Sequence, residues 1–170
     1  MPFGEYVPLS GVFTFLDKIA RAAGDFARGT EPNLLPVGRE RLGMAICFEV
    51  VFPSEVAELV REGATVLLTI TNDAWYGDTA APWQHFRAAR FRAAENRRPL
   101  LRAAITGVTA VVEPDGSVLS SLGLFEEGVL PTRVLGRTDL SPASRWPAWV
   151  PVLSIALALL ALSFSRSRKP

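Results

Sequence analysis

The chain has 170 residues, 49% of them hydrophobic and 21% charged, so it is long enough for one domain with a core and is not intrinsically disordered. Lys and Arg total 18 against 17 Asp and Glu, and this near balance provides no bulk attraction to nucleic acid. A single cysteine excludes an internal disulfide, and together with a single histidine it cannot supply a Cys/His zinc site. We therefore expect no metal, no cofactor and no nucleic-acid partner.

The hydrophobic pattern alternates between short apolar runs and amphipathic stretches, which is typical of a mixed α/β domain. Turn residues mark the boundaries, with Gly63 ending one helix and Pro114–Gly116 forming a hairpin turn. In chain order, we predict a helix over 13–23 and a long loop, a buried strand over 42–47, a helix over 54–62, a buried strand over 65–71, a helix over 83–96, strands over 100–104, 109–113 and 118–121, and a further strand over 129–134.

The C-terminal segment is the most apolar part of the chain. Residues 146–165 contain no charge, begin with Trp146 and Trp149, and precede a basic tail over 166–170. About 20 apolar residues are enough to span a bilayer, and the basic tail then places the C-terminus in the cytoplasm. We therefore predict a transmembrane helix over 146–165, joined to the domain by a polar linker over 136–145. A buried core helix is the alternative.

The first residues, Met1 to Tyr6, do not form a signal peptide, because they have neither a basic region nor an apolar one. A domain outside the cytoplasm needs a way across the membrane, and nothing before residue 146 provides one. We therefore expect the sequence to be incomplete at its start.

Cys47 is the first candidate for chemistry because it ends a buried strand. A nucleophile at such a turn is exposed at the sheet edge, and the next N–H, that of Phe48, can face a developing oxyanion. An inert core cysteine is the alternative. His85 is either a structural histidine or a base for Cys47. Glu5 and Glu49 are the carboxylates flanked by apolar or turn residues, although such groups are more often solvated or paired at the surface.

Five motifs in a fixed order carry a resemblance over nearly the whole chain. They are PFGEYVP over 2–8, ICFE over 46–49, NDAWYG over 72–77, the run from PWQH over 82–85 to RPLLR over 98–102, and GVTA over 107–110. The first three motifs resemble the nitrilase, or carbon–nitrogen hydrolase, superfamily. The full set is similar to one branch of it, the apolipoprotein N-acyltransferases.

The resemblance implies a four-layer αββα sandwich, of which residues 1–135 are the C-terminal part. It implies transfer of an acyl chain from a phospholipid to a cysteine thioester, and then to the N-terminal amine of a diacylglyceryl-cysteine apolipoprotein. The implied partners are the phospholipid donor, the apolipoprotein acceptor and the bilayer. The implied location is the cytoplasmic membrane, with the domain on its outer, periplasmic side.

Residue by residue, the resemblance matches Cys47 to the nucleophile and Glu5 to a supporting glutamate. Phe48 and Glu49 match positions beside the nucleophile, and Trp75 matches an aromatic residue near the site. The family's catalytic set is Glu, Lys and Cys, and the first two lie upstream of the PFGE motif, before Met1. We therefore expect the 170-residue chain alone to carry out no acyl transfer.

Two other functions stay open: an amidase of the nitrilase superfamily that hydrolyses C–N bonds, and a catalytically inactive, membrane-anchored remnant. The arginines of the helix over 83–96 and its end also have two interpretations. They either meet lipid phosphate or form ion pairs within the domain, and the second is the commoner situation. They are Arg87, Arg90, Arg92, Arg97 and Arg98.

Overall fold

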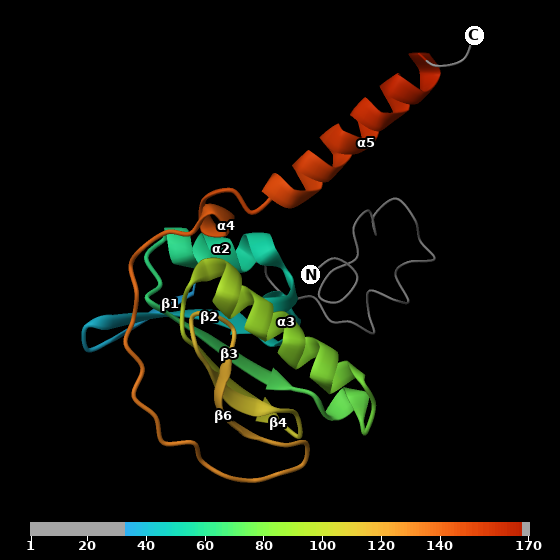
Figure 1. The fold of residues 1–170 in the computed structure, drawn as a ribbon. Helices are drawn as coiled ribbons and strands as arrows, with labels where there is room; N and C mark the ends of the chain where they lie inside the picture. The colour runs from blue at the N-terminus through green and yellow to red at the C-terminus, as the bar shows by residue number, and fades with distance from the viewer. Residues whose placement is uncertain (1–32, 168–170) are drawn as a thin grey trace, which may run out of the picture. The chain divides into compact units, whose positions relative to one another are not determined.

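The computed structural model describes residues 33–167, which form a mixed six-stranded sheet with helices packed on it (Figure 1). The strands lie in the sheet in the same order as in the chain. The second, third and fourth strands run parallel to one another. The first strand pairs antiparallel with the second, the fifth with the fourth, and the sixth with the fifth. The strands are β1 (Leu34–Val37), β2 (Glu40–Ile46), β3 (Val66–Asn72), β4 (Leu100–Ile105), β5 (Thr109–Val112) and β6 (Val118–Leu122).

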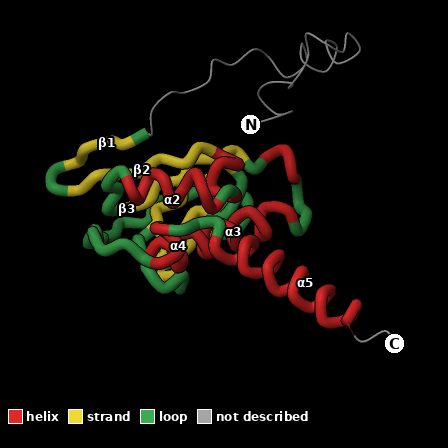
Figure 2. The backbone as a smooth tube through the Cα atoms, turned by 90° about the horizontal axis from the view of Figure 1, so that it is seen from above, coloured by secondary structure: helices red, strands yellow, loops and turns green. Residues whose placement is uncertain are grey.

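Two helices provide the crossovers between the parallel strands. Helix α2 (Pro53–Arg61) joins β2 to β3, and helix α3 (Ala81–Asn96) joins β3 to β4. Since crossovers between parallel strands are almost always right-handed, successive helices reach the same face of the sheet. Figures 1 and 2 show α2 and α3 side by side on that face. The core lies between these helices and the strands, with Val56, Val60, Leu67 and Leu100 fully buried.

Helix α3 faces the sheet with one continuous stripe. Its buried positions recur every three or four residues, which is the spacing of one helix face. Small alanines in the stripe allow close approach to the strands, and the polar members reach the sheet edge. The buried residues are Pro82, His85, Phe86, Ala89, Arg92, Ala93 and Asn96.

The predicted α/β pattern is present, with two differences at the strand level. Residues 129–134, predicted as a strand, form none; Val129 is 85% exposed and Pro131 lacks the N–H that a ladder requires. Strand β1 lies in the expected loop and pairs with β2 through the tight turn at Gly38, whose φ is 60°. The helix predicted over 13–23 lies outside the described residues.

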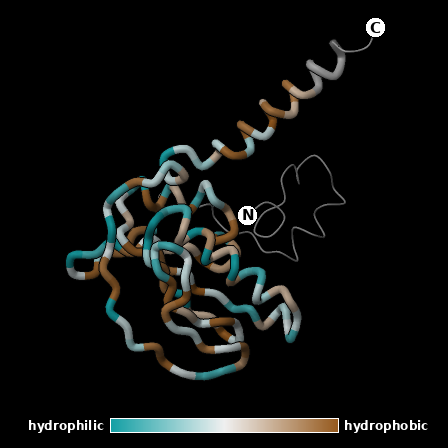
Figure 3. Tube along the Cα trace, in the orientation of Figure 1, coloured by the Kyte–Doolittle hydropathy of each residue, from teal (hydrophilic) through white to brown (hydrophobic). Residues whose placement is uncertain are grey.

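The predicted transmembrane helix over 146–165 is wrong. Trp146 follows the short helix α4 (Pro142–Arg145), and the C-terminal helix α5 (Trp149–Ser167) begins only at Trp149. The helix is apolar along much of its length (Figure 3), but its 19 residues include Arg166. Within residues 33–167, no helix is both long and apolar enough to cross a membrane. The orientation expected from that helix, with a cytoplasmic C-terminus, is therefore not supported either.

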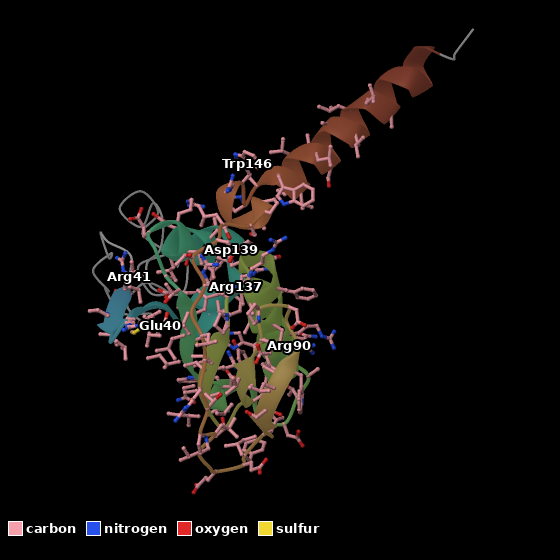
Figure 4. The ribbon with its side chains drawn as sticks, turned by 60° about the vertical axis from the view of Figure 1, so that its left-hand side comes forward. Glu40, Arg41, Arg90, Arg137, Asp139 and Trp146 are labelled. Atoms are coloured by element: carbon pink, nitrogen blue, oxygen red, sulfur yellow. The ribbon has the colours of Figure 1, made fainter. Side chains whose placement is uncertain are left out.

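Residues 136–145, for which a linker is expected, make specific contacts with the helices. Ser144 is fully buried, and its Oγ donates to Asn96 Oδ1 at 2.9 Å. Its carbonyl accepts from Arg61 Nη1 at 2.9 Å, which ties α4 to α2. In the segment that leads into α4, Arg137 and Asp139 lie next to each other (Figure 4), and Arg137 Nε donates to Asp139 Oδ1 at 3.0 Å.

Candidate active site

The carboxyl ends of the three parallel strands meet at one edge of the sheet, where α/β proteins place their ligands. Cys47 directly follows β2, Asp73 directly follows β3, and Thr106 directly follows β4. These positions are far apart in the chain, and the parallel register brings them to the same edge. The edge is therefore the candidate active site.

Cys47 occupies a sharp turn between β2 and a 3-10 helix, η2 (Cys47–Val51). Its φ is 52°, in the left-handed region that residues with a Cβ rarely adopt. Such strain is concentrated at functional sites, and a nucleophile at a strained strand-to-helix turn projects from the sheet edge. Cys47 is partly exposed, as an accessible nucleophile has to be.

The two residues after Cys47 shape this turn. The carboxylate of Glu49 accepts a hydrogen bond from the backbone N–H of Ile46, at 2.6 Å. This bond joins the residue after Phe48 to the residue before Cys47 and so closes the turn. The Phe48 ring packs edge-on against Phe52, with 5.9 Å between ring centroids. Glu49 therefore acts on the backbone around Cys47, in the arrangement seen here.

Helix α3 fixes η2 through two side chains from the same face. His85 Nε2 lies 3.1 Å from the Cys47 carbonyl oxygen, and Arg92 Nη1 donates to the Val51 carbonyl at 2.9 Å. The two residues are seven positions apart, which is two helical turns. Both ends of η2 are thus attached to one rigid element.

A buried charged network lies behind Cys47. Asp73 is 1% exposed; its Oδ2 accepts from Arg102 Nη2 at 2.7 Å, and its Oδ1 lies 3.0 Å from His85 Nδ1. Thr71 Oγ1 donates to the same Oδ1 at 3.0 Å. Arg102 Nε donates to the Val108 carbonyl at 3.1 Å, so the guanidinium is itself held.

The charges of this network alter its ionisation. Burial raises the pKa of Asp73, but the hydrogen bond with His85 and the charge of Arg102 outweigh burial and leave the pKa below its ordinary value. Burial lowers the pKa of Arg102, against the opposing charge of Asp73. The network is therefore a carboxylate stabilised by cationic and hydrogen-bonding neighbours.

The aromatic residues after β3 lie in a short 3-10 helix, η3 (Ala74–Tyr76). Tyr76 faces the site: its ring is edge-on to His85, with 6.3 Å between centroids, and burial followed by the charges of Cys47 and Asp73 raises its pKa. Trp75 is 89% exposed. Of the two neighbours, Tyr76 is the one in contact with the buried network.

Of the site residues expected from the sequence, Cys47, Phe48 and Glu49 lie together at this turn, and Trp75 follows the next strand with its side chain in solvent. Glu5 lies outside the described residues. His85 is beside Cys47, but it contacts the carbonyl oxygen and not the sulfur.

Three residues of the site were not predicted as such: Asp73, Tyr76 and Arg102. Two of them stand in the NDAWYG motif, and the third ends the RPLLR run. The sequence offered two signals for them: Asp73 is a charged residue directly after a buried strand, and Arg102 is an arginine within a strand. A buried charge needs a partner, so the two could have been expected to pair.

The arginines of α3 and its C-terminus mostly make contacts within the domain. Arg92 pairs with Glu95 at 2.9 Å, Arg90 donates to the Gly116 carbonyl at 2.9 Å, and Arg97 lies 3.8 Å from Asp139. Arg98 is 1% exposed and donates to the Ala64 carbonyl. All four side chains make ion-pair or hydrogen-bond contacts within the domain.

The lowered pKa of Asp73 makes the stability of the domain depend on pH. Because the folded pKa is below the unfolded one, the stabilisation is present above about pH 5 and is lost as the pH falls through the folded pKa. We expect the free energy of unfolding to decrease from about pH 5 downwards, and Asp73→Asn to flatten that decrease. Denaturant titrations between pH 3 and 7 measure it; an equal slope in Asp73→Asn would contradict the assignment.

A strained turn at the end of a sheet strand is the arrangement in which α/β hydrolases expose their nucleophile, and cysteine is one of the residues that can act as one. The family described as carbon-nitrogen hydrolase matches residues 10–138, and the chain belongs to this family. The resemblance seen in the sequence is thereby confirmed.

Two curated relatives, both named apolipoprotein N-acyltransferase, are 40% identical to the chain. The protein from Geobacter metallireducens matches over 169 residues, 98% of this chain and 32% of its own length. The protein from Ralstonia nicotianae matches over 174 residues, 99% of this chain and 33% of its own length. The chain thus spans about a third of the length of these relatives.

Among solved structures, the chain is similar to the amidase from Nesterenkonia sp. AN1. One structure, a mutant with acrylamide added at the active-site cysteine, has a TM-score of 0.50 and 27% identity, covering 62% of this chain and 43% of the amidase. A second mutant, described as an amidase from the nitrilase superfamily, gives the same TM-score at 25% identity. The described residues therefore have a nitrilase-like fold.

Proposed function

We propose that this chain carries the cysteine-bearing part of an apolipoprotein N-acyltransferase, with Cys47 as the nucleophile. The observation that carries the proposal is the left-handed backbone of Cys47 at the carboxyl end of β2, which presents a thiol at the sheet edge. The relatives named apolipoprotein N-acyltransferase, 40% identical over almost the whole chain, support this reaction.

In the proposed reaction, the Cys47 thiolate attacks an ester carbonyl of a phospholipid. The C–O bond breaks, the lysophospholipid leaves as an alkoxide that takes up a proton to become an alcohol, and the acyl chain stays on sulfur as a thioester. The N-terminal amine of a diacylglyceryl-cysteine apolipoprotein then attacks the thioester. The C–S bond breaks, an amide forms, the amine loses a proton, and the thiol is restored.

Other residues of the site have supporting roles in this proposal. The N–H of Phe48, which follows the nucleophile, donates to the oxyanion of each tetrahedral intermediate. Glu49 keeps the turn closed through its bond to the Ile46 N–H. Glu5 is matched by resemblance alone to a supporting glutamate and has that role in this proposal, and Trp75 offers an exposed aromatic surface beside the site.

The test places residues 1–170 in the corresponding C-terminal third of the Geobacter metallireducens relative, with the unaltered relative as positive control. With a labelled phospholipid, we expect a hydroxylamine-labile acyl-enzyme in the chimera and none in its Cys47→Ser form, because serine cannot form a thioester. A lipopeptide acceptor should discharge the label as an amide. If the Cys47→Ser chimera still accumulates the thioester, the nucleophile is misassigned.

The 170-residue chain alone is assayed in parallel. We propose that it carries out no acyl transfer, because none of its residues matches the family's general-base glutamate and lysine. Lipid-dependent acylation of a lipopeptide by this chain would contradict that proposal.

The similarity to the amidase from Nesterenkonia sp. AN1 favours a second candidate, hydrolysis of a small amide through the same cysteine. The chimera distinguishes the two: release of ammonia from butyramide with no acylation by phospholipid would favour the amidase, and the reverse result would favour the acyltransferase.

A further inference from the structure

The contact between His85 and Cys47 fixes the position of one hydrogen atom. Nε2 lies 3.1 Å from the carbonyl oxygen of Cys47, and a carbonyl oxygen accepts hydrogen bonds but never donates them. Nε2 therefore carries the hydrogen. A nitrogen used in this way cannot remove the proton of the Cys47 thiol, so the geometry does not support His85 as the general base.

The other ring nitrogen does not change this conclusion. Nδ1 lies 3.0 Å from Asp73 Oδ1 and 3.2 Å from Arg102 Nη2. If Nδ1 is protonated it donates to the carboxylate, and if it is not it accepts from the guanidinium. In both states Nε2–H faces the Cys47 carbonyl.

His85 is held rigidly for this task. It is 4% exposed, and its ring contacts those of Phe48 and Tyr76, with 6.0 and 6.3 Å between ring centroids. The Asp73 partner is anchored in turn by the Arg102 guanidinium and by its own backbone N–H, which donates to the Ile105 carbonyl at 3.1 Å. The network thus connects β3, β4 and α3 to the turn that bears the nucleophile.

The left-handed backbone of Cys47 is disfavoured for a residue with a Cβ and persists only where the surroundings enforce it. The buried His85 contacts the carbonyl oxygen of Cys47. The carboxylate of Glu49 accepts a hydrogen bond from the Ile46 N–H, which precedes Cys47 in the chain. The two contacts restrain the backbone before and after the Cys47 Cα atom.

We propose that His85 is a positioning residue for Cys47: supported by Asp73 and Arg102, it donates Nε2–H to the Cys47 carbonyl oxygen and so maintains the strained turn that presents the thiol. The inference rests on the proposed role of Cys47 as nucleophile for its catalytic consequence, while the hydrogen bond itself is independent of any activity.

The chain offers a direct test, because it contains one histidine and one cysteine. The 170-residue chain is labelled with ¹⁵N in the histidine ring and with ¹³C at the cysteine carbonyl, so each spectrum reports a single residue. We expect the Nε2 signal of a protonated nitrogen at neutral pH. An unprotonated Nε2 overturns the proposal without any substitution.

Two variants then separate the hydrogen bond from general packing. His85→Leu removes the donor, and we expect the Cys47 carbonyl signal to move upfield; His85→Gln, whose Nε2 can still donate, should leave the signal close to the original. Ser144→Ala removes a buried hydrogen bond from α4 to Asn96 at the far end of α3, and it serves as the control that leaves the Cys47 carbonyl unchanged. An unchanged signal in a folded His85→Leu chain overturns the proposal, and if that chain does not fold, the wild-type and His85→Gln spectra decide.

The catalytic consequence is measured in the chimera described above. We expect His85→Leu to lower the rate constant of thioester formation at least tenfold with little change in KM for the phospholipid, and His85→Gln to restore most of it. Equal acylation rates in all three forms contradict the positioning role. If the unsubstituted chimera forms no thioester, the proposed function fails, whereas the spectra still decide the hydrogen bond.

Discussion

Replacing Asp73 with alanine is expected to destabilise the domain by about 3–5 kcal/mol, because the substitution leaves a buried guanidinium without its counter-ion. Arg102 is 2% exposed, and its Nη2 donates to Asp73 at 2.7 Å. A single domain is stable by only about 5–15 kcal/mol, so this is a large part of the total. Differential scanning calorimetry of the 170-residue chain should show a Tm lower by roughly 10–20 °C.

The matched control is Asp139→Ala, which removes a surface aspartate 3.0 Å from Arg137 (Figure 4) and 3.8 and 3.9 Å from Arg97 and Arg98. The Asp139 side chain is 44% exposed, and solvent-exposed ion pairs contribute little. The buried Arg98 keeps its hydrogen bonds to the backbone carbonyls of Ala64 and of residue 139, so we expect a small change in Tm. Removing both partners, in Asp73→Leu with Arg102→Met, should recover part of the loss, because no unpaired charge remains. Equal effects of Asp73→Ala and Asp139→Ala would show that the buried network does not contribute as argued.

Gly107→Ala is expected to cost about 3 kcal/mol through overpacking against the same carboxylate. A Cβ at this position would lie 2.8 Å from Asp73 Cγ and 2.9 Å from Asp73 Cβ, and closest of all to Oδ2, the oxygen that Arg102 binds. The side chain of Asp73 cannot move away without breaking that pair. Chemical denaturation monitored by circular dichroism measures the loss.

Gly123→Ala is the control for this substitution, since its Cβ would meet only Glu126 Oε2 at an ordinary 3.5 Å. The sharper comparison is a double-mutant cycle. With alanine at position 73 the carboxylate is gone, so Gly107→Ala should then cost much less than it does alone. Additive effects of the two substitutions would mean that Gly107 is required for another reason.

Both substitutions act on a group that the proposed chemistry does not touch directly. Asp73 reaches Cys47 only through His85, so damage to the network should appear both as lost stability and as a displaced Cys47. This coupling explains why a strained turn can persist at the sheet edge, since the surrounding structure has to enforce it.

The sequence by itself determined the class of fold and the candidate nucleophile. Apolar runs of strand length alternate with amphipathic helical stretches, and this local pattern predicted β2, α2, β3, α3 and the hairpin of β5 and β6. Cys47 at the end of a buried run followed from the same pattern. The ordered motifs indicated the family, because motif spacing is a property of the chain alone.

The sequence did not determine where helices begin within uniformly apolar segments. Residues 146–165 have the composition of a membrane span, but Trp146 follows α4 and the helix begins at Trp149. Hydropathy averages over a window and does not register such a break. Strand β1 was missed for a related reason: its pairing with β2 depends on a turn at Gly38, and its own residues are mostly exposed.

Only the tertiary structure decided how the site is assembled. Asp73 and Arg102 are 29 residues apart, and His85 is 38 residues from Cys47; no local periodicity relates either pair. The parallel register of β2, β3 and β4 brings their ends to one edge, and the crossover helix α3 places His85 against the Cys47 carbonyl. The sequence shows that a cysteine ends the strand, but the packing of separate elements determines which atoms contact it. The physical reason is that side-chain direction at a strand end depends on the strand register and on the helix packed against it.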